Sequence, residues 1–182
     1  MEQNTALLVL DMQSSVLQML PDANNLLGNV SKAIAKAREQ NSKVIYVILS
    51  FRPNAPEISP NNTGFMQFKE NILNIDLNEW EKIDERVAPL EDDIIIIRRR
   101  MSAFTGSDLE VVLRSLSITH LALAGFASRG VVLSTAREAA DKDYKVTVLS
   151  DCCADTEADV HKFLMEKVFI WGADVKTLQQ LD

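Results

Sequence analysis

Five strand-length apolar runs, separated by segments of helical periodicity, most constrain the fold of this 182-residue chain. The first run is 6–10, and the third, 94–97, consists of four consecutive isoleucines. The runs lack polar alternation, and strands buried on both faces are typical of a parallel sheet covered by helices. The remaining runs are 43–49, 121–125 and 145–149, with a short edge strand expected within 173–178.

Apolar residues at helical spacing lie between these runs, for example Val30, Ala33, Ile34 and Ala37. The repeated strand-then-helix order predicts an α/β fold, a single three-layer α/β/α domain over residues 1–182. Residues 51–90 interrupt the pattern with clustered prolines, and we expect them to be irregular. A segment of that length is a candidate lid or substrate loop.

Charge and composition exclude several classes of protein. The formal net charge is −7, and the only basic run is Arg98–Arg100, which argues against nucleic-acid binding. No apolar stretch is long enough for a transmembrane helix, and the N-terminus lacks the features of a signal peptide. Cys152 and Cys153 are adjacent, so they form neither a disulfide framework nor a zinc site. We therefore expect a cytoplasmic protein.

Ligands of open parallel sheets bind beyond the carboxyl ends of the strands. Asp11 follows the first run and Arg98 follows the third, so a carboxylate and a guanidinium are expected to converge there. Alternatively, Asp11 only caps a turn or pairs with Arg98. Arg99 and Arg100 alternate in direction with Arg98, so at least one of them must face elsewhere.

The turn after the fourth run enters a helix, where a nucleophile commonly sits because the helix N-terminus stabilises anions. Val131 occupies this place and has no lone pair with which to attack. Cys152 or Cys153 is a possible substitute, although a buried, inert thiol is the more ordinary interpretation. Ser128 and Ser134 have no histidine near them in the sequence, which disfavours a serine triad.

The motifs of one known family recur here in the same order and at the same spacing, in segments 11–13, 98–104, 125–139 and 148–155. Through these segments, nearly the whole chain resembles the isochorismatase-like, or cysteine hydrolase, family. The resemblance implies a six-stranded, mainly parallel sheet and hydrolysis of small amides, imides or the vinyl ether of isochorismate. It also implies a catalytic aspartate after strand one, a lysine after strand three and a cysteine at the start of the helix after strand four.

Carried over by position, Asp11 matches the aspartate, Arg98 stands at the lysine and Val131 stands at the cysteine. The resemblance therefore predicts a member without the nucleophilic cysteine. It also implies a cis peptide bond between Phe126 and Ala127. The family's metal-binding histidines after strand two are missing, so we expect neither a metal nor another cofactor.

Our first hypothesis is a hydrolase of a small anionic or amide-type metabolite that works without a covalent intermediate. Asp11 would be the general acid or base, and Arg98 would hold an anionic group. The backbone N–H groups of Gly130 and Val131 would bind developing negative charge. The predicted substrate-binding residues are Gln13, Phe51, Arg52, Phe104, Phe126, Ala127 and Gly130, although Phe104 and Phe126 fit a core role equally well.

The alternative is a catalytically inactive member that binds a small ligand or a protein partner. Loss of both the cysteine and the lysine favours this second hypothesis. For either one we expect a small-molecule ligand, no nucleic acid, no membrane, and a homo-dimer or tetramer. Residues 51–90 are long enough to reach a neighbouring subunit and to place a residue near the mouth of its pocket.

Overall fold

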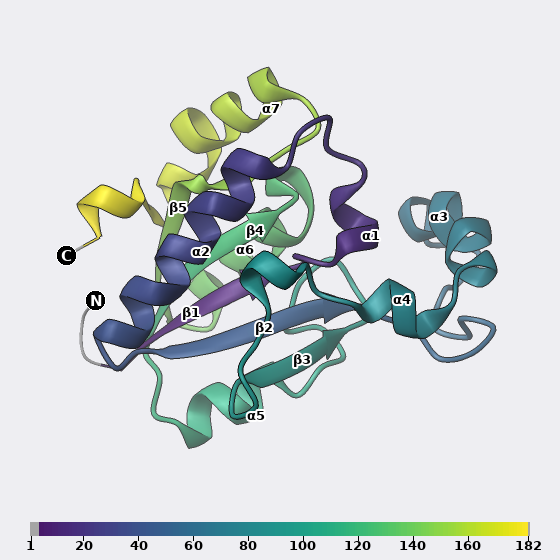
Figure 1. Ribbon diagram of the computed structural model, residues 1–182, viewed down its shortest axis with the longest axis horizontal. Coiled ribbons are helices and arrows are strands. Elements are labelled where there is room, and N and C mark those ends of the chain that lie inside the picture. The colour runs from purple at the N-terminus through teal and green to yellow at the C-terminus, as the bar shows by residue number, and fades with distance from the viewer. Residues whose placement is uncertain (1–3, 182) are drawn as a thin grey trace.

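In the computed structural model, which describes residues 4–181, six strands form one sheet in the order β3-β2-β1-β4-β5-β6 (Figure 1). Every neighbouring pair is parallel. The α/β class and the six-stranded parallel sheet are thus confirmed. The strands are β1 (Thr5–Leu10), β2 (Lys43–Leu49), β3 (Ile94–Arg98), β4 (His120–Phe126), β5 (Lys145–Ala154) and β6 (Asp174–Lys176).

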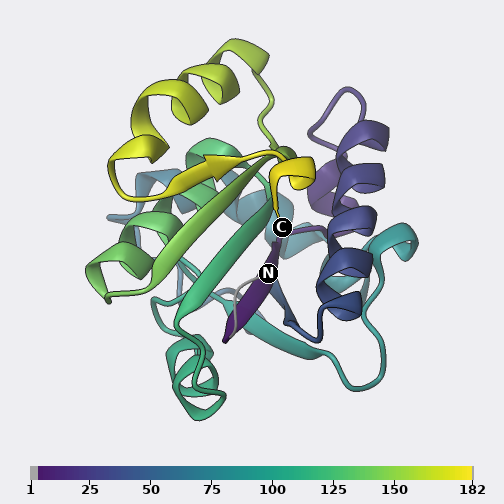
Figure 2. The same cartoon turned by 90° about the vertical axis from the view of Figure 1, so that its left-hand side faces the viewer.

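Helices cover both faces of the sheet. Leu7 and Val9 of β1 pack into the cluster that contains the apolar side of α2, whereas Leu8 and Leu10 pack into the cluster of α5 and α6. Figure 2 shows α2 and α6 on opposite sides of the strands. The helical elements are α1 (Ser14–Leu17), α2 (Asn24–Glu39), α3 (Thr63–Asn74), α4 (Leu77–Glu81), η1 (Glu85–Val87), α5 (Leu109–Ser115), η2 (Ser128–Val132), α6 (Leu133–Asp141), α7 (Ala158–Phe163), η3 (Leu164–Val168), η4 (Phe169–Trp171) and η5 (Leu178–Gln180).

The expectation that residues 51–90 are irregular is wrong, because this segment contains α3, α4 and η1. The prolines all precede or follow these helices. Asn62 caps α3 by accepting a hydrogen bond from the Phe65 N–H at 3.1 Å. Phe65 and Ile72 then lie seven residues apart on one side of the helix, buried in a small cluster with Phe51. Helix α3 projects from the side of the molecule toward which β2 and β3 run (Figure 1).

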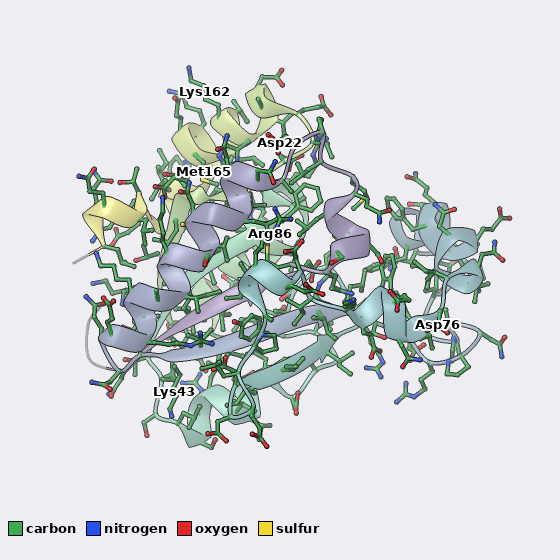
Figure 3. All side chains as sticks on the ribbon, viewed as in Figure 1. Asp22, Lys43, Asp76, Arg86, Lys162 and Met165 are labelled. Carbon is green, nitrogen blue, oxygen red and sulfur yellow. The ribbon has the colours of Figure 1, made fainter. Side chains whose placement is uncertain are left out.

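The end of this segment is joined to the α2 layer. Arg86 in η1 donates hydrogen bonds to Asp84 and, at 2.8 Å, to Asn24 at the start of α2. Figure 3 labels Arg86, which lies beside α2. Within residues 4–181, none of the helices combines the length and the apolar character that a membrane span requires.

Gly125 brings the ends of β1 and β4 into close contact. Its φ is +137°, and a Cβ atom at this position would lie 2.0 Å from the Leu10 carbonyl oxygen. Only glycine fits such an approach without moving the backbone. Asp11 and Phe126 directly follow this pair of residues, so the ends of both strands meet at one edge of the sheet.

Candidate functional site

An ion pair between Asp11 and Arg98 joins the end of β1 to the end of β3. The Arg98 Nε–H donates to both carboxylate oxygens at 2.9 and 3.1 Å, and an Nη2–H donates to Asp11 Oδ2. The Asp11 side chain is 3% exposed and that of Arg98 is 5% exposed. The predicted convergence of these two residues is therefore observed as a direct, buried contact.

The backbone at Asp11 turns the chain out of the strand. Its φ is +51°, a region in which aspartate is among the more tolerated residues. The Asp11 N–H donates to the Val47 carbonyl oxygen at 2.8 Å, so this residue is held by β2 as well as by Arg98. Its carboxylate is thus fixed in direction by both backbone and side-chain contacts.

Burial and the neighbouring charge of Arg98 shift the pKa of Asp11 in opposite directions. Removal from water raises the pKa of Asp11 above its usual value, and the Arg98 guanidinium only partly offsets that rise. The carboxyl group is consequently easier to protonate than an exposed aspartate, which is a property of general acids.

The basic run 98–100 divides as the strand geometry predicts. Arg99 points away from Asp11 and donates to Glu57 at 2.9 Å, which also accepts from Arg52 at 2.7 Å. Arg98 is therefore the member of the run that meets the aspartate. Arg52, predicted to bind substrate, has a 64% exposed side chain and pairs with Glu57 inside the 51–90 segment, while Arg99 joins Glu57 to the end of β3.

The turn after β4 contains the cis peptide bond between Phe126 and Ala127 that the resemblance implies. The Gly130 N–H donates to the Ala127 carbonyl oxygen at 3.0 Å, so it is already engaged within the turn. It is therefore not the free donor that we expected for developing negative charge, whereas the same role for the Val131 N–H stays a prediction. Val131 is buried in the apolar cluster on the α6 face of the sheet.

Gln13 is fully buried and connects three elements. Its Nε2 donates to the carbonyl oxygens of Leu49 at 3.1 Å and Trp80 at 2.6 Å, while its Oε1 accepts from the Leu49 N–H at 2.8 Å. Both N–H groups of the amide are engaged. Gln13 therefore fixes the end of β2 and helix α4 rather than presenting a free amide to a ligand.

The predicted aromatic residues do not gather at one place. Phe104 packs beside Tyr144 in the cluster of α5 and α6, whereas Phe126 and the half-buried Ala127 pack on the α2 face. Phe51 meets Phe65 edge-on, with ring centroids 5.7 Å apart, in the separate cluster beneath α3. The core interpretation holds for Phe104 and Phe126.

Both thiols are buried on opposite faces of the sheet. Cys152 belongs to the α2-side cluster, and Cys153 lies on the other side with its Sγ 3.7 Å from the Leu123 carbonyl oxygen. Burial raises the pKa of Cys153 to about 12 and that of Cys152 further still. Such thiols stay protonated and are poor nucleophiles.

Ser128 has a histidine partner that the sequence did not reveal. Its Oγ lies 2.8 Å from His161 Nδ1 and donates to the Ala154 carbonyl oxygen at 3.0 Å. His161 is 33 residues away, and the fold brings it close because α7 follows the strand beside β4. Ser128 is fully buried, so its hydroxyl ties α7 to the turn and is not exposed to a substrate.

Two surface grooves border α6, and they share Arg137 and Asp141. Neither is lined by Asp11, Arg98 or Val131. Met101 lines one of these grooves, and its Sδ would be 4.0 Å from a Cβ atom on Gly130. Among residues 4–181, no three histidine, cysteine or acidic side chains are grouped so as to hold a metal ion.

Comparisons with known proteins place this geometry in context. The family model "Isochorismatase domain" matches residues 5–180. A structure of an isochorismatase family protein from Burkholderia thailandensis superposes with a TM-score of 0.85 at 25% identity, covering 97% of this chain and 93% of the other. The chain is also similar to N-carbamoylsarcosine amidase from Thermoplasma acidophilum, with a TM-score of 0.78, 25% identity and 95% of each chain covered.

One relative bears on activity. An Arabidopsis thaliana protein described as a probable inactive nicotinamidase, At3g16190, is 26% identical over 87% of this chain and 85% of its own length. The similar proteins therefore include both an amidase and one described as probably inactive.

Proposed function

The chain belongs to the isochorismatase family, and we propose that it is a hydrolase of a small anionic metabolite that works without a cysteine nucleophile. The observation that carries this proposal is the buried ion pair of Asp11 and Arg98 at the carboxyl edge of the sheet. Val131 takes the place of the family's cysteine in this proposal.

A covalent thiol mechanism receives no support from this chain. Val131 offers no nucleophilic atom, and the thiols of Cys152 and Cys153 are buried with raised pKa values. Amide hydrolysis by direct water attack also requires donors for the oxyanion that forms. Of the two predicted donors, Gly130 and Val131, the Gly130 N–H is engaged by the Ala127 carbonyl oxygen.

Hydrolysis of a vinyl ether fits the same residues better, since positive rather than negative charge develops. Protonated Asp11 would transfer its proton to the terminal carbon of the C=C bond. Water would then add to the resulting oxocarbenium carbon and return a proton to Asp11. The hemiketal breaks into an alcohol and a ketone, so one water is consumed and Asp11 is regenerated.

Arg98 would orient both Asp11 and the substrate. A guanidinium has five N–H groups, and the bonds to Asp11 and to the Arg100 carbonyl oxygen use one at Nε, one at Nη2 and one at Nη1. The two remaining N–H groups suit a substrate carboxylate, for which arginine is the preferred partner. This supports an anionic substrate.

A second candidate is a non-catalytic, ligand-binding member of the family. The observation that favours it is the enclosure of Asp11, whose two carboxylate oxygens both accept from Arg98 and whose side chain is 3% exposed. In this arrangement the ion pair would be a structural tie between β1 and β3. The probably inactive Arabidopsis relative is consistent with that interpretation.

Activity assays with Asp11→Asn separate the two candidates. We expect the native protein to hydrolyse a vinyl ether that carries a carboxylate, and the variant to lose about 10²–10⁴-fold in kcat/KM. Circular dichroism and urea unfolding of the variant show whether it is folded under assay conditions. Absence of activity on vinyl ether, ester and amide substrates, or an unaffected folded variant, would overturn the proposed mechanism.

Val131→Cys provides the complementary test. The helix that begins at residue 133 would lower the pKa of a thiol placed just before it. If the variant gains amidase activity that the native protein lacks, the assignment of residue 131 to the cysteine position is supported. A variant whose thiol reacts no faster than those of Cys152 and Cys153 would contradict that assignment.

A further inference from the structure

One of the two grooves beside α6 lies between three segments that are far apart in the sequence. Its sides are the start of α3, the loop 100–105 and one face of α6, and we call it the α3–α6 groove. Its volume is about 570 Å³, which falls within the range of about 300–1,000 Å³ that is usual for small-molecule sites. The groove is therefore large enough to hold a small ligand.

The α3–α6 groove adjoins the candidate site at two points. Arg98 donates a hydrogen bond from Nη1 to the carbonyl oxygen of Arg100, and Arg100 lines the groove. Ser134, which also lines the groove, follows Val131 by three residues. A ligand at this end of the groove would thus lie next to the Asp11–Arg98 pair without displacing it.

Four side chains at this end keep hydrogen-bond donors without an acceptor. The Arg100 guanidinium donates only to the Arg99 carbonyl oxygen, at 2.6 Å, so four of its five N–H groups are free. The Ser134 hydroxyl forms no hydrogen bond with any residue from 4 to 181. Ser102 and Asn62 each accept from a backbone N–H, but their own O–H and N–H groups meet no acceptor in that part of the chain. We call these four residues the donor end.

The acidic side chains of the groove lie further along α6. Asp141 follows Ser134 by seven residues, which corresponds to about 10 Å along a helix. Glu138 is already engaged, because it accepts from the Thr105 hydroxyl at 2.9 Å. Arg137 lies between the two ends and has no ion-pair partner within residues 4–181. The donor end is consequently positive and well supplied with N–H and O–H groups.

We propose that the donor end binds the phosphate group of a small phosphorylated ligand. A phosphate monoester presents three strong acceptor oxygens and up to two negative charges. One guanidinium, one amide and two hydroxyl groups supply donors for all three oxygens, and arginine is well suited to phosphate. A carboxylate, with two oxygens, would leave part of this set without an acceptor. Binding here goes beyond the proposed hydrolysis and does not require it, because no residue of the donor end belongs to the Asp11–Arg98 pair.

Titration with inorganic phosphate tests this site directly. Isothermal calorimetry at about pH 8, where phosphate carries two charges, and in about 0.1 M NaCl, which screens weak surface attraction, should give saturable binding. Arg100→Gln should weaken the binding about tenfold or more, since it removes the charged donor. Ser134→Ala should weaken it several-fold through loss of one hydrogen bond. Ser134→Glu should abolish it, because a carboxylate would then face the phosphate.

Arg86→Gln is the matched control. Arg86 is another exposed arginine, but it bonds to Asn24 of α2, on the opposite face of the sheet from α6. Its removal should leave the affinity for phosphate unchanged. The proposal is overturned if the native chain shows no saturable binding, if Arg100→Gln and Ser134→Ala bind phosphate as the native chain does, or if acetate binds as tightly as phosphate. Circular dichroism of each variant separates loss of binding from loss of folding.

Discussion

Two Asp–Arg pairs stand at the same edge of the sheet and differ in the solvation of their arginines. Asp11 and Arg98 are both almost completely buried, whereas the buried Asp155 after β5 pairs with Arg129, whose side chain is 42% exposed. Asp155 also accepts hydrogen bonds from the backbone N–H groups of Arg129 and Thr156, each at 2.8 Å. The same two residue types therefore occupy very different environments.

The difference appears in the direction of the two pKa shifts. Burial raises the pKa of both carboxyl groups, but around Asp155 the hydrogen bonds from Arg129 and from two backbone N–H groups outweigh it, so the pKa of Asp155 is lowered. For Asp11 burial prevails and the pKa is raised. Asp155 thus ionises more readily than an exposed aspartate and anchors the turn after β4, while Asp11 is the carboxyl group suited to proton transfer.

Removal of each arginine should show the largest contrast. Arg98→Met leaves a buried carboxyl group without its partner, and we expect a loss of about 3–5 kcal/mol in the free energy of unfolding at neutral pH. Arg129→Met removes a partly exposed partner and leaves the backbone N–H donors of the buried Asp155 side chain in place, so a smaller loss of about 1–2 kcal/mol is expected. Urea unfolding monitored by circular dichroism measures both values.

Similar losses in the free energy of unfolding for Arg98→Met and Arg129→Met would show that the exposure of the arginine does not distinguish the two pairs. Arg98→Lys is the useful intermediate, because it keeps the charge but not the planar fork of the guanidinium. We expect its stability to lie between those of the native chain and Arg98→Met.

Much of this edge could be predicted from the sequence. The apolar runs without alternation predicted a parallel sheet. The positions of Asp11 and Arg98 at the carboxyl ends of two strands predicted that they converge. Features that depend on tertiary packing could not be predicted. The Ser128–His161 contact spans 33 residues, and the hydrogen bonds that occupy Gln13 come from backbone groups, which carry no sequence signature. Helix α3 was missed because the nearby prolines outweighed its Asn62 cap and its sparse apolar residues.

The pH dependence of stability should have opposite signs for the two aspartates. The pKa of Asp155 is lowered by folding, so its contribution is present above the unfolded value of 3.8 and is lost as pH falls through the folded pKa. The difference in free energy of unfolding between the native chain and Asp155→Asn should therefore shrink in acid. It is measured by urea unfolding at a series of pH values.

For Asp11 the folded pKa is raised, so its contribution is present below 3.8 and is lost as pH rises through the folded pKa. In the same pH series, the free energy of unfolding of the native chain should therefore rise relative to that of Asp11→Asn as pH falls. A shift in the same direction as for Asp155 would mean that Arg98, rather than burial, dominates the environment of Asp11.

Thiol chemistry should give the smallest effect, and it tests whether the Asp155 side of the edge is chemically active. Cys152 and Cys153 lie just before Asp155, and both thiols are buried with raised pKa values. Since the thiolate is the reactive form, we expect no alkylation of the folded protein by iodoacetamide and modification of both thiols in urea. Mass spectrometry of intact protein reads out the labelling, and hydrolase activity should be the same before and after treatment of the folded chain. Rapid labelling of one thiol with a parallel loss of activity would contradict this prediction. It would mean that the catalytic group lies at the end of β5, beside Asp155, and is not Asp11.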